Sequence, residues 1–502
     1  MASPLILAID QGTSSTKALL VDGEGRVLSR ASAPLAETQP RPGWVEQDPE
    51  ELWQSVRQAV AACVTPDRAR RVAGVGISNQ RESLVLWERR TGKPLGPLLS
   101  WQDQRTTGRC RELAAEAELV RSVSGMPLDP MFSALKARWL LDTYGRSEVC
   151  LGTVDSWLLS RFGGEHVIEA GNASRTQLLG VETARWDPGL LELFGVPAEV
   201  LPRVVSSFGP FPAVRDLAPL PDGVPVLAVL GDSHAAMFAH AGWRPGVVKA
   251  TYGTGSSVMA IGGGRSAGLC RSIAWDLGDG PVPAVEGNIR ATGRTITWLS
   301  ELLGVPAETL LAEAEGADAD GVTFVPAFGG LGAPWWEPDA TPVITGFSLG
   351  TRRAQLAAAA LEAVAFQVED VVTAVEEAAG QVRVLMADGG LTRSARLMRL
   401  QADLSGRTVA RSGEHDLSAL GAADAAGLAA GLWTTEELEC RPRPAEEFRP
   451  AADGSYRRAR HATWRAAVRR ARPCQESQDA REESQDARED SRARPDEERS
   501  ST

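Results

Sequence analysis

Short apolar runs alternate along the chain with stretches in which apolar residues recur at helical spacing. Four of these runs have the length and composition of buried strands: 5–9, 72–77, 224–230 and 382–386. Buried strands that alternate with helices are typical of layered α/β proteins rather than of all-α or all-β folds. We therefore predict an α/β fold for the main part of the chain.

The ends of several helices can be located from capping residues. Asp48 suits the N-cap of a helix, and Pro49 suits the first helical position. Two further helices are predicted at 351–380 and 394–406, and each ends at a glycine. The predicted helices lie between predicted strands, as a layered fold requires.

Two segments of the chain resemble each other. The apolar run at 5–9 leads into Asp10-Gln-Gly-Thr-Ser-Ser, and an apolar run near 247 leads into Tyr252-Gly-Thr-Gly-Ser-Ser. Each turn is followed by another apolar stretch, which predicts a hairpin. We interpret the repeat as a duplication that gives two similar domains with a cleft between them. The predicted domains are 1–245 and 246–471.

The last segment, 472–502, differs from the rest in composition. From Gln475 to Thr502 the sequence has no valine, isoleucine, leucine, methionine or aromatic residue, and ESQDARE occurs twice in tandem. Such a segment has too little apolar surface to offset the entropy of ordering it. We predict a disordered, charged C-terminal tail.

The overall composition excludes several classes of protein. The 502 residues carry a formal net charge of -12, so no basic surface is expected for nucleic acid. No apolar run approaches the ~18 residues of a membrane helix, so membrane insertion is not expected either. The six cysteines form no CxxC pair, which favours a reducing compartment. We expect a cytoplasmic protein.

The first polar turn contains groups suited to a phosphorylated ligand. A glycine at position 12 lets the backbone approach a ligand closely, and the hydroxyls of Thr13, Ser14 and Ser15 suit phosphate oxygens. Asp10 suits Mg²⁺, directly or through water. An ordinary polar turn is the alternative, although the second turn, 253–256, makes a pair of phosphate-binding turns more plausible.

Other candidate residues follow predicted strands. Asp232 is a candidate general base for a substrate hydroxyl, or else a cap of the following helix. The adjacent Arg81 and Glu82 can bind neighbouring hydroxyls of a polyol, or they form a solvated charge pair. Trp101 and Met131 are candidate apolar walls, although such side chains are more often core.

Seven segments, in order and spacing, resemble the FGGY family of carbohydrate kinases, and its glycerol kinase branch in particular. They are Ile9-Asp-Gln-Gly-Thr13, Pro42-Gly-Trp-Val-Glu-Gln-Asp48, Ile77-Ser-Asn-Gln-Arg-Glu82, Asn172-Ala-Ser-Arg-Thr176, Thr251-Tyr-Gly-Thr-Gly255, Val325-Pro-Ala-Phe-x-Gly-Leu-Gly-Ala-Pro334 and Asp388-Gly-Gly390. The resemblance covers the chain from residue 5 to about 471. It implies two actin-like (ribonuclease H-like) domains around a central cleft that binds ATP, Mg²⁺ and a small polyol or sugar.

The resemblance also implies roles for individual residues. Asp232 falls on the position of the catalytic base, and Asp10 on the position that assists Mg²⁺. The positions that contact acceptor or nucleotide are matched as follows: Arg81, Glu82, Trp101, Met131, Asp232 and Ser233 for the acceptor, and Thr13, Ser14, Ser15, Lys17, Thr254, Gly293, Thr297, Gly390 and Ser394 for ATP. The implied reaction is transfer of the γ-phosphoryl group to a primary hydroxyl. Similar kinases are often homo-oligomers, which leaves that state open for this chain.

The chain departs from the glycerol kinase pattern at four positions. Met131 stands where tyrosine is usual, Ser233 where glutamine is, Ser257 where phenylalanine is and Lys17 where arginine is. Smaller side chains leave space around a molecule as small as glycerol. Glycerol remains the leading acceptor because the Arg81 and Glu82 pair is kept, and a larger polyol or a ketopentose such as xylulose is the alternative. A catalytically silent ATP- or sugar-binding protein is disfavoured, because both aspartates and both turns are present.

Overall fold

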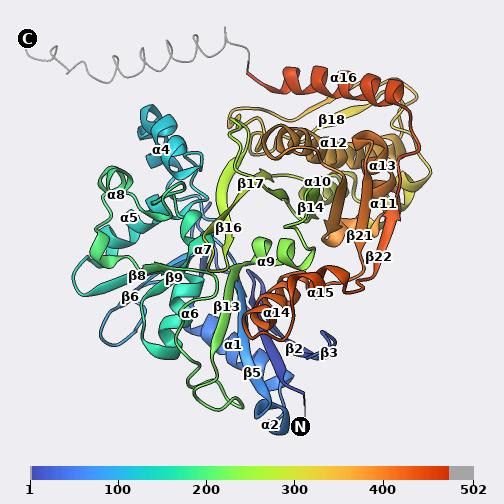
Figure 1. Cartoon of the computed structure of the whole chain (residues 1–502). Coiled ribbons are helices and arrows are strands. Elements are labelled where there is room, and N and C mark those ends of the chain that lie inside the picture. The colour runs from blue at the N-terminus through green and yellow to red at the C-terminus, as the bar shows by residue number, and fades with distance from the viewer. Residues whose placement is uncertain (1–2, 474–502) are drawn as a thin grey trace, which may run out of the picture.

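The computed structural model describes residues 3–473. The predicted tail, 472–502, lies outside the described residues except for its first two positions. Figure 1 shows two groups of strands, each covered by helices, with β16 and β17 between them. The predicted α/β fold is confirmed.

The first half is built on a five-stranded sheet with the order β13-β5-β1-β2-β3. β1 pairs antiparallel with β2 and parallel with β5, and β5 pairs parallel with β13. Alternate residues of β1 enter different cores on the two faces of this sheet, which explains why the strand is apolar throughout. The strands are β1 (Leu5–Gln11), β2 (Ser15–Asp22), β3 (Val27–Pro34), β5 (Val72–Asn79) and β13 (Val226–Gly231).

The second half is built on a seven-stranded sheet with the order β16-β17-β15-β14-β20-β21-β22. Five of its strands, β17-β15-β14-β20-β21, repeat the order and the directions of β3-β2-β1-β5-β13. The inferred duplication is therefore present in the topology. The strands are β14 (Val247–Tyr252), β15 (Ser256–Ile261), β16 (Cys270–Asp276), β17 (Pro281–Ile289), β20 (Val384–Asp388), β21 (Thr408–Ser412) and β22 (Ala445–Phe448).

The capping residues locate three helices correctly. α1 (Pro49–Cys63) begins after Asp48, whose carboxylate accepts hydrogen bonds from the backbone N–H groups of Glu50 and Glu51. α12 (Arg353–Ala379) and α13 (Ala395–Ser405) each end at a glycine. Other helices in the described chain are α2 (Pro66–Ala69), α3 (Thr107–Glu112), α4 (Ala117–Ser124), α5 (Ser133–Tyr144), α6 (Val154–Gly163), α7 (Ala170–Ser174), α8 (Pro188–Phe194), α9 (Asp232–Ala239), α10 (Gly293–Leu303), α11 (Ala307–Glu315), α14 (Leu417–Ala429), α15 (Thr435–Cys440) and α16 (Gly454–Ala471).

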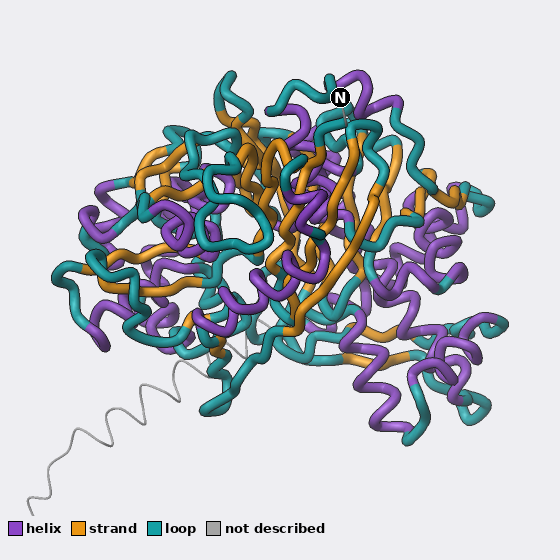
Figure 2. Tube along the Cα trace, turned by 90° about the horizontal axis from the view of Figure 1, so that it is seen from below, coloured by secondary structure: helices purple, strands orange, loops and turns teal. Residues whose placement is uncertain are grey.

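Smaller sheets decorate the two halves, and strands run through the middle of the molecule with helices outside them (Figure 2). A four-stranded sheet in the first half has the order β4-β7-β6-β8. The remaining short strands form pairs. Their bounds are β4 (Glu46–Gln47), β6 (Leu84–Glu88), β7 (Leu98–Leu99), β8 (Val149–Thr153), β9 (Val167–Glu169), β10 (Leu179–Gly180), β11 (Arg185–Trp186), β12 (Arg203–Val205), β18 (Thr323–Val325) and β19 (Val343–Thr345). Within 3–473, no helix is both long and apolar enough to span a bilayer.

Helix α14 belongs to the second half by sequence but packs on the sheet of the first half. Its apolar residues share one core with β1, β13 and α9, and Figure 1 shows it beside the blue strands. Two glycines allow this close approach. A Cβ on Gly421 would lie 1.7 Å from the carbonyl oxygen of Ala235, and a Cβ on Gly76 would lie 2.1 Å from that of Ala422. The two halves therefore contact each other through closely packed backbone as well as through side chains.

Candidate active site

The first polar turn is a tight hairpin between β1 and β2, as predicted. The N–H of Gly12 donates to the carbonyl of Ser15 at 3.0 Å, which closes the turn. Trp101 lies against this turn, and its indole N–H donates to the hydroxyl of Thr13 at 3.0 Å. A predicted acceptor-site residue is thus in contact with a predicted phosphate-site residue.

Asp10 lies at the end of β1, where its carboxylate is buried and accepts a hydrogen bond from the hydroxyl of Ser78 on β5. Burial raises the pKa of Asp10 to about 6, against opposing effects of that hydrogen bond and of Lys17. The negative charges of Asp232 and Asp416 raise it further. A buried carboxylate in such surroundings is stabilised in its ionised form by a cation.

The second turn lies at the meeting point of three glycine-containing segments. The N–H of Gly253 donates to the carbonyl of Gly255 at 3.0 Å. A Cβ on Gly293 would lie 2.6 Å from the carbonyl oxygen of Gly253, and one on Gly389 would lie 2.5 Å from that of Tyr252. The structure therefore brings together three predicted nucleotide-binding positions: Thr254, Gly293 and Gly390.

Three other predicted nucleotide-binding residues have side-chain contacts within the protein. Thr297 lies one turn along α10 from Gly293 and donates to its carbonyl. Ser394 caps α13 by accepting from the N–H of Leu397. Lys17 pairs with Asp416 at 3.2 Å, a contact between the halves that the sequence did not indicate.

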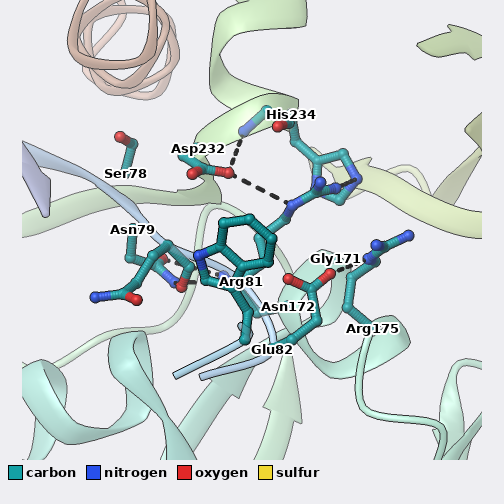
Figure 3. A network of polar contacts seen from close by, with 12 residues as sticks. Ser78, Asn79, Arg81, Glu82, Gly171, Asn172, Arg175, Asp232 and His234 are labelled. Atoms are coloured by element: carbon teal, nitrogen blue, oxygen red, sulfur yellow. Dashed lines mark hydrogen bonds and ion pairs between the residues drawn. The ribbon is translucent and has the colours of Figure 1, made fainter. Parts of the chain in front are cut away.

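Asp232 lies at the junction of β13 and α9, with its carboxylate directed at the loop after β5 (Figure 3). Its Oδ1 accepts from the N–H of Ser233 at 2.6 Å and lies 3.4 Å from Nε of Arg81. The interpretation of Asp232 as the helix cap is wrong, because the N-cap of α9 is Gly231 and no side chain caps the helix; the carboxylate instead faces the predicted acceptor residues. Burial raises its pKa, while Arg81 opposes that rise.

Arg81 and Glu82 are buried, with 7% and 5% of their surface exposed, so the interpretation as a solvated charge pair is wrong. Glu82 adopts a left-handed backbone with φ of 60°, which is uncommon for a residue other than glycine, asparagine or aspartate. This turn sends the two side chains to different partners. Arg81 reaches Asp232, whereas Glu82 accepts from Nε of Arg175 at 2.5 Å.

Two residues that are not among the predicted site residues complete this cluster. Both guanidinium NH2 groups of Arg81 donate to the two carboxylate oxygens of Glu286 at 2.8 Å, and Arg175 lies 3.1 Å from the same carboxylate. Arg175 lies in the segment Asn172–Thr176 that resembles the family, whereas nothing around Glu286 in the sequence marks it as a site residue. No local spacing signals their contact, because Arg81 and Glu286 are 205 positions apart.

The side chains of Met131 and Ser233 lie near this cluster and are half-buried. Met131 packs against a small core formed by Met126, Phe132 and Cys270. Ser233 follows Asp232 on the first turn of α9. The departures from the glycerol kinase pattern therefore occur beside buried charges, where a change of side-chain volume alters the space left for an acceptor.

The chain matches two family models. Residues 5–239 match the N-terminal domain of the FGGY family of carbohydrate kinases, and residues 248–430 match the C-terminal domain of that family. This chain belongs to the FGGY family. As an FGGY kinase it is an ATP-dependent phosphotransferase that uses Mg²⁺.

Two relatives with known names match nearly the whole length of this chain. Apulose kinase of Pectobacterium atrosepticum is 41% identical, over 94% of this chain and 99% of its own length. Glycerol kinase of Citrifermentans bemidjiense is also 41% identical, over 92% and 98%. Among solved structures, Plasmodium falciparum glycerol kinase with ADP is similar with a TM-score of 0.87 at 28% identity, over 93% and 98%. The FGGY kinase therefore has the two-domain, actin-like fold.

The described residues fit both cofactors of an FGGY kinase. The glycines at 253, 255, 293 and 389 let three segments pack backbone against backbone, and backbone N–H groups gathered in this way suit phosphate oxygens. Asp10 supplies a hard oxygen ligand for Mg²⁺. Within 3–473, no cluster of three acidic, His or Cys side chains could hold a metal by itself.

Proposed function

We propose that this kinase transfers the γ-phosphoryl group of MgATP to a primary hydroxyl of a small polyol or sugar, with glycerol as the leading acceptor. The observation that carries the proposal is the placement of Asp232. Its half-buried carboxylate faces Arg81, and its charge is close enough to Asp10 to raise the pKa of that residue. A base for the acceptor and a carboxylate for the metal thus share one cleft.

In this proposal the protein positions groups and moves one proton. Asp232 takes the proton of the acceptor hydroxyl as the phosphoryl group is transferred in line. Arg81 and Glu82 orient neighbouring hydroxyls, with Trp101 as an apolar wall. MgATP supplies the phosphoryl group, and its magnesium ion neutralises part of the phosphate charge. The polar turns at 10–17 and 253–256 hold the phosphates. Closure of the two halves over the substrates excludes water.

A ketopentose or larger polyol is the second candidate acceptor. The FGGY relatives at 41% identity include an apulose kinase as well as a glycerol kinase, so overall similarity does not separate the two acceptors. The smaller Ser233 and Ser257, and Met131 in place of tyrosine, favour a pocket wider than glycerol needs. Arg81 and Glu82 favour glycerol.

A substrate panel tests the proposed function. Purified protein with MgATP should release ADP above the ATP-only blank when given glycerol, erythritol, pentitols, xylulose, apulose or hexoses. We expect the largest kcat/KM with glycerol. A larger kcat/KM with a ketopentose would contradict glycerol as the leading acceptor and support the second candidate. In that case the double variant Ser233→Gln, Ser257→Phe should shift the preference toward glycerol. No release above the blank with any compound contradicts the proposed function.

The pH dependence of the reaction should report Asp232. The carboxylate accepts a proton only when ionised, and burial raises its pKa above the ordinary 3.8. Therefore kcat/KM should fall as the pH is lowered through this raised pKa, which places the acid limb above pH 4. Initial rates at saturating MgATP, with circular dichroism at each pH to confirm folding, measure the limb. A rate that stays constant down to pH 4 in folded protein contradicts the assignment.

We further infer that the kinase works in the cytoplasm on a small molecule, because its cysteines are scattered and its second substrate is ATP.

The proposed domain boundary at 245 is supported by the gap between the matched regions 5–239 and 248–430. Helix α14 then belongs to the second domain while covering the sheet of the first. A homo-oligomer stays a prediction.

A further inference from the structure

Five charged side chains, four of them buried and Asp232 half-buried, form an unbroken series between the two sheets. In order they are Asp232, Arg81, Glu286, Arg175 and Glu82, and each arginine lies between two carboxylates. Glu286 is the central member and has no exposed surface. It is also the member contributed by the second sheet, from β17, while the other four belong to the first half.

We propose that Glu286 is a positioning residue for the acceptor site: from the second sheet it holds Arg81 against Asp232 and Arg175 against Glu82. This inference rests on the proposed function of the first-half residues. The geometry supports it because the bidentate contact of Arg81 with Glu286 uses both terminal nitrogens of the guanidinium, and only Nε is left to face Asp232. Glu286 thus determines that Asp232 faces the Nε edge of the Arg81 guanidinium.

One of the arginines beside Glu286 is not fully satisfied even with the carboxylate in place. Nη2 of Arg175 is already buried without a hydrogen-bond partner among the described residues. A glutamine at 286 would keep one carbonyl acceptor and would turn an NH2 donor toward the other guanidinium. One arginine would then lose its partner. Its guanidinium would be left buried without a compensating charge, and it would move from its present position to find one.

The experiment compares Glu286→Gln with Glu182→Gln in the full chain. Glu182 is the matched control because it also forms an ion pair between the two halves, with Arg271 of β16, but it is 68% exposed at the surface. In Glu286→Gln we expect about a 10²-fold loss of kcat/KM for the acceptor, as displacement of a reacting group by about 1 Å produces. Acceptor KM should rise about tenfold, and KM for MgATP should stay within about twofold. The control should match wild type in all three.

The acid limb of kcat/KM gives a second readout. The charged groups that face Asp232 are Arg81 and Glu82 from the loop after β5, Lys249 from β14 and Asp10 from β1. Without the charge of Glu286, Arg81 is no longer held against Asp232, so its lowering effect on the pKa of that carboxyl weakens and the limb moves to higher pH. Lower activity with an unmoved limb and unchanged acceptor KM means a purely structural role, and overturns the proposal.

A third readout needs no turnover, so it separates this inference from the proposed function. Nε2 of His234 lies 3.5 Å from Nη1 of Arg81 (Figure 3), and the chain has five histidines. With ¹⁵N-labelled histidine, the His234 signal, assigned by its absence in His234→Asn, should shift in Glu286→Gln but not in Glu182→Gln. An unshifted signal overturns the inference, whereas a wild-type enzyme that is inactive on every acceptor overturns the proposed function alone.

Discussion

Asp232→Asn should lower kcat for phosphoryl transfer by about 10² to 10⁴-fold, the usual contribution of a general base. Asparagine has nearly the same shape and can still accept the hydrogen bond from the N–H of Ser233, so the start of α9 should be kept. The change removes the proton acceptor and leaves the glycine segments that face the nucleotide untouched. Steady-state ADP release at saturating acceptor and MgATP measures the loss.

The control for this prediction is Asp67→Asn, an exposed carboxylate in the first turn of α2. It should keep wild-type kcat. Binding of ADP to Asp232→Asn, measured by calorimetry, should stay within about twofold of wild type. Wild-type turnover by Asp232→Asn would show that another group takes the proton.

Gly421→Ala should be the most destabilising single methyl addition in the fold core. The added Cβ would lie 1.7 Å from the carbonyl oxygen of Ala235, and the atom that it meets is backbone on α9 rather than the end of a flexible side chain. Moving α14 away from α9 opens the core shared with β1 and β13. We expect a loss of about 3 kcal/mol, the upper part of the range for overpacking.

Thermal unfolding and soluble yield at 37 °C measure this effect. The matched control is Gly316→Ala, where an added Cβ has no heavy atom within 4 Å and φ is negative. It should unfold within a degree or two of wild type. Equal midpoints for the two variants would mean that α14 can shift without cost, and that its packing on the first sheet is loose.

Features encoded over a few neighbouring residues could be predicted from the sequence. The cap at Asp48 and the hairpin after Asp10 are set by local chemistry, and the structure has both. The repeated strand order follows from duplication of one such unit. The roles assigned to Asp232, Arg81 and the nucleotide-binding positions stay predictions, although the structure gathers most of these residues around the cleft.

Features that depend on distant segments could not be predicted. Glu286 is one acidic residue among many in the sequence, and its importance arises only when β17 brings it to Arg81. The ion pair of Lys17 with Asp416, just before α14, joins residues about 400 positions apart, while the place of Lys17 at the nucleotide stays a prediction. Likewise, the alanine-rich sequence of α14 is apolar nearly all round and shows only that the helix is buried, not which sheet it covers.

The placement of α14 also constrains the order of synthesis and folding. The last strand of the first sheet ends at Gly231, but the helix that covers one face of that sheet starts at Leu417. At about 5–20 residues per second, the ribosome needs roughly ten seconds or more to bridge that interval. During this time the face that later meets α14 lacks its cover. The first half therefore completes its core only when the second half has been nearly finished, and a nascent chain halted at the domain boundary is a substrate for chaperones rather than a folded domain.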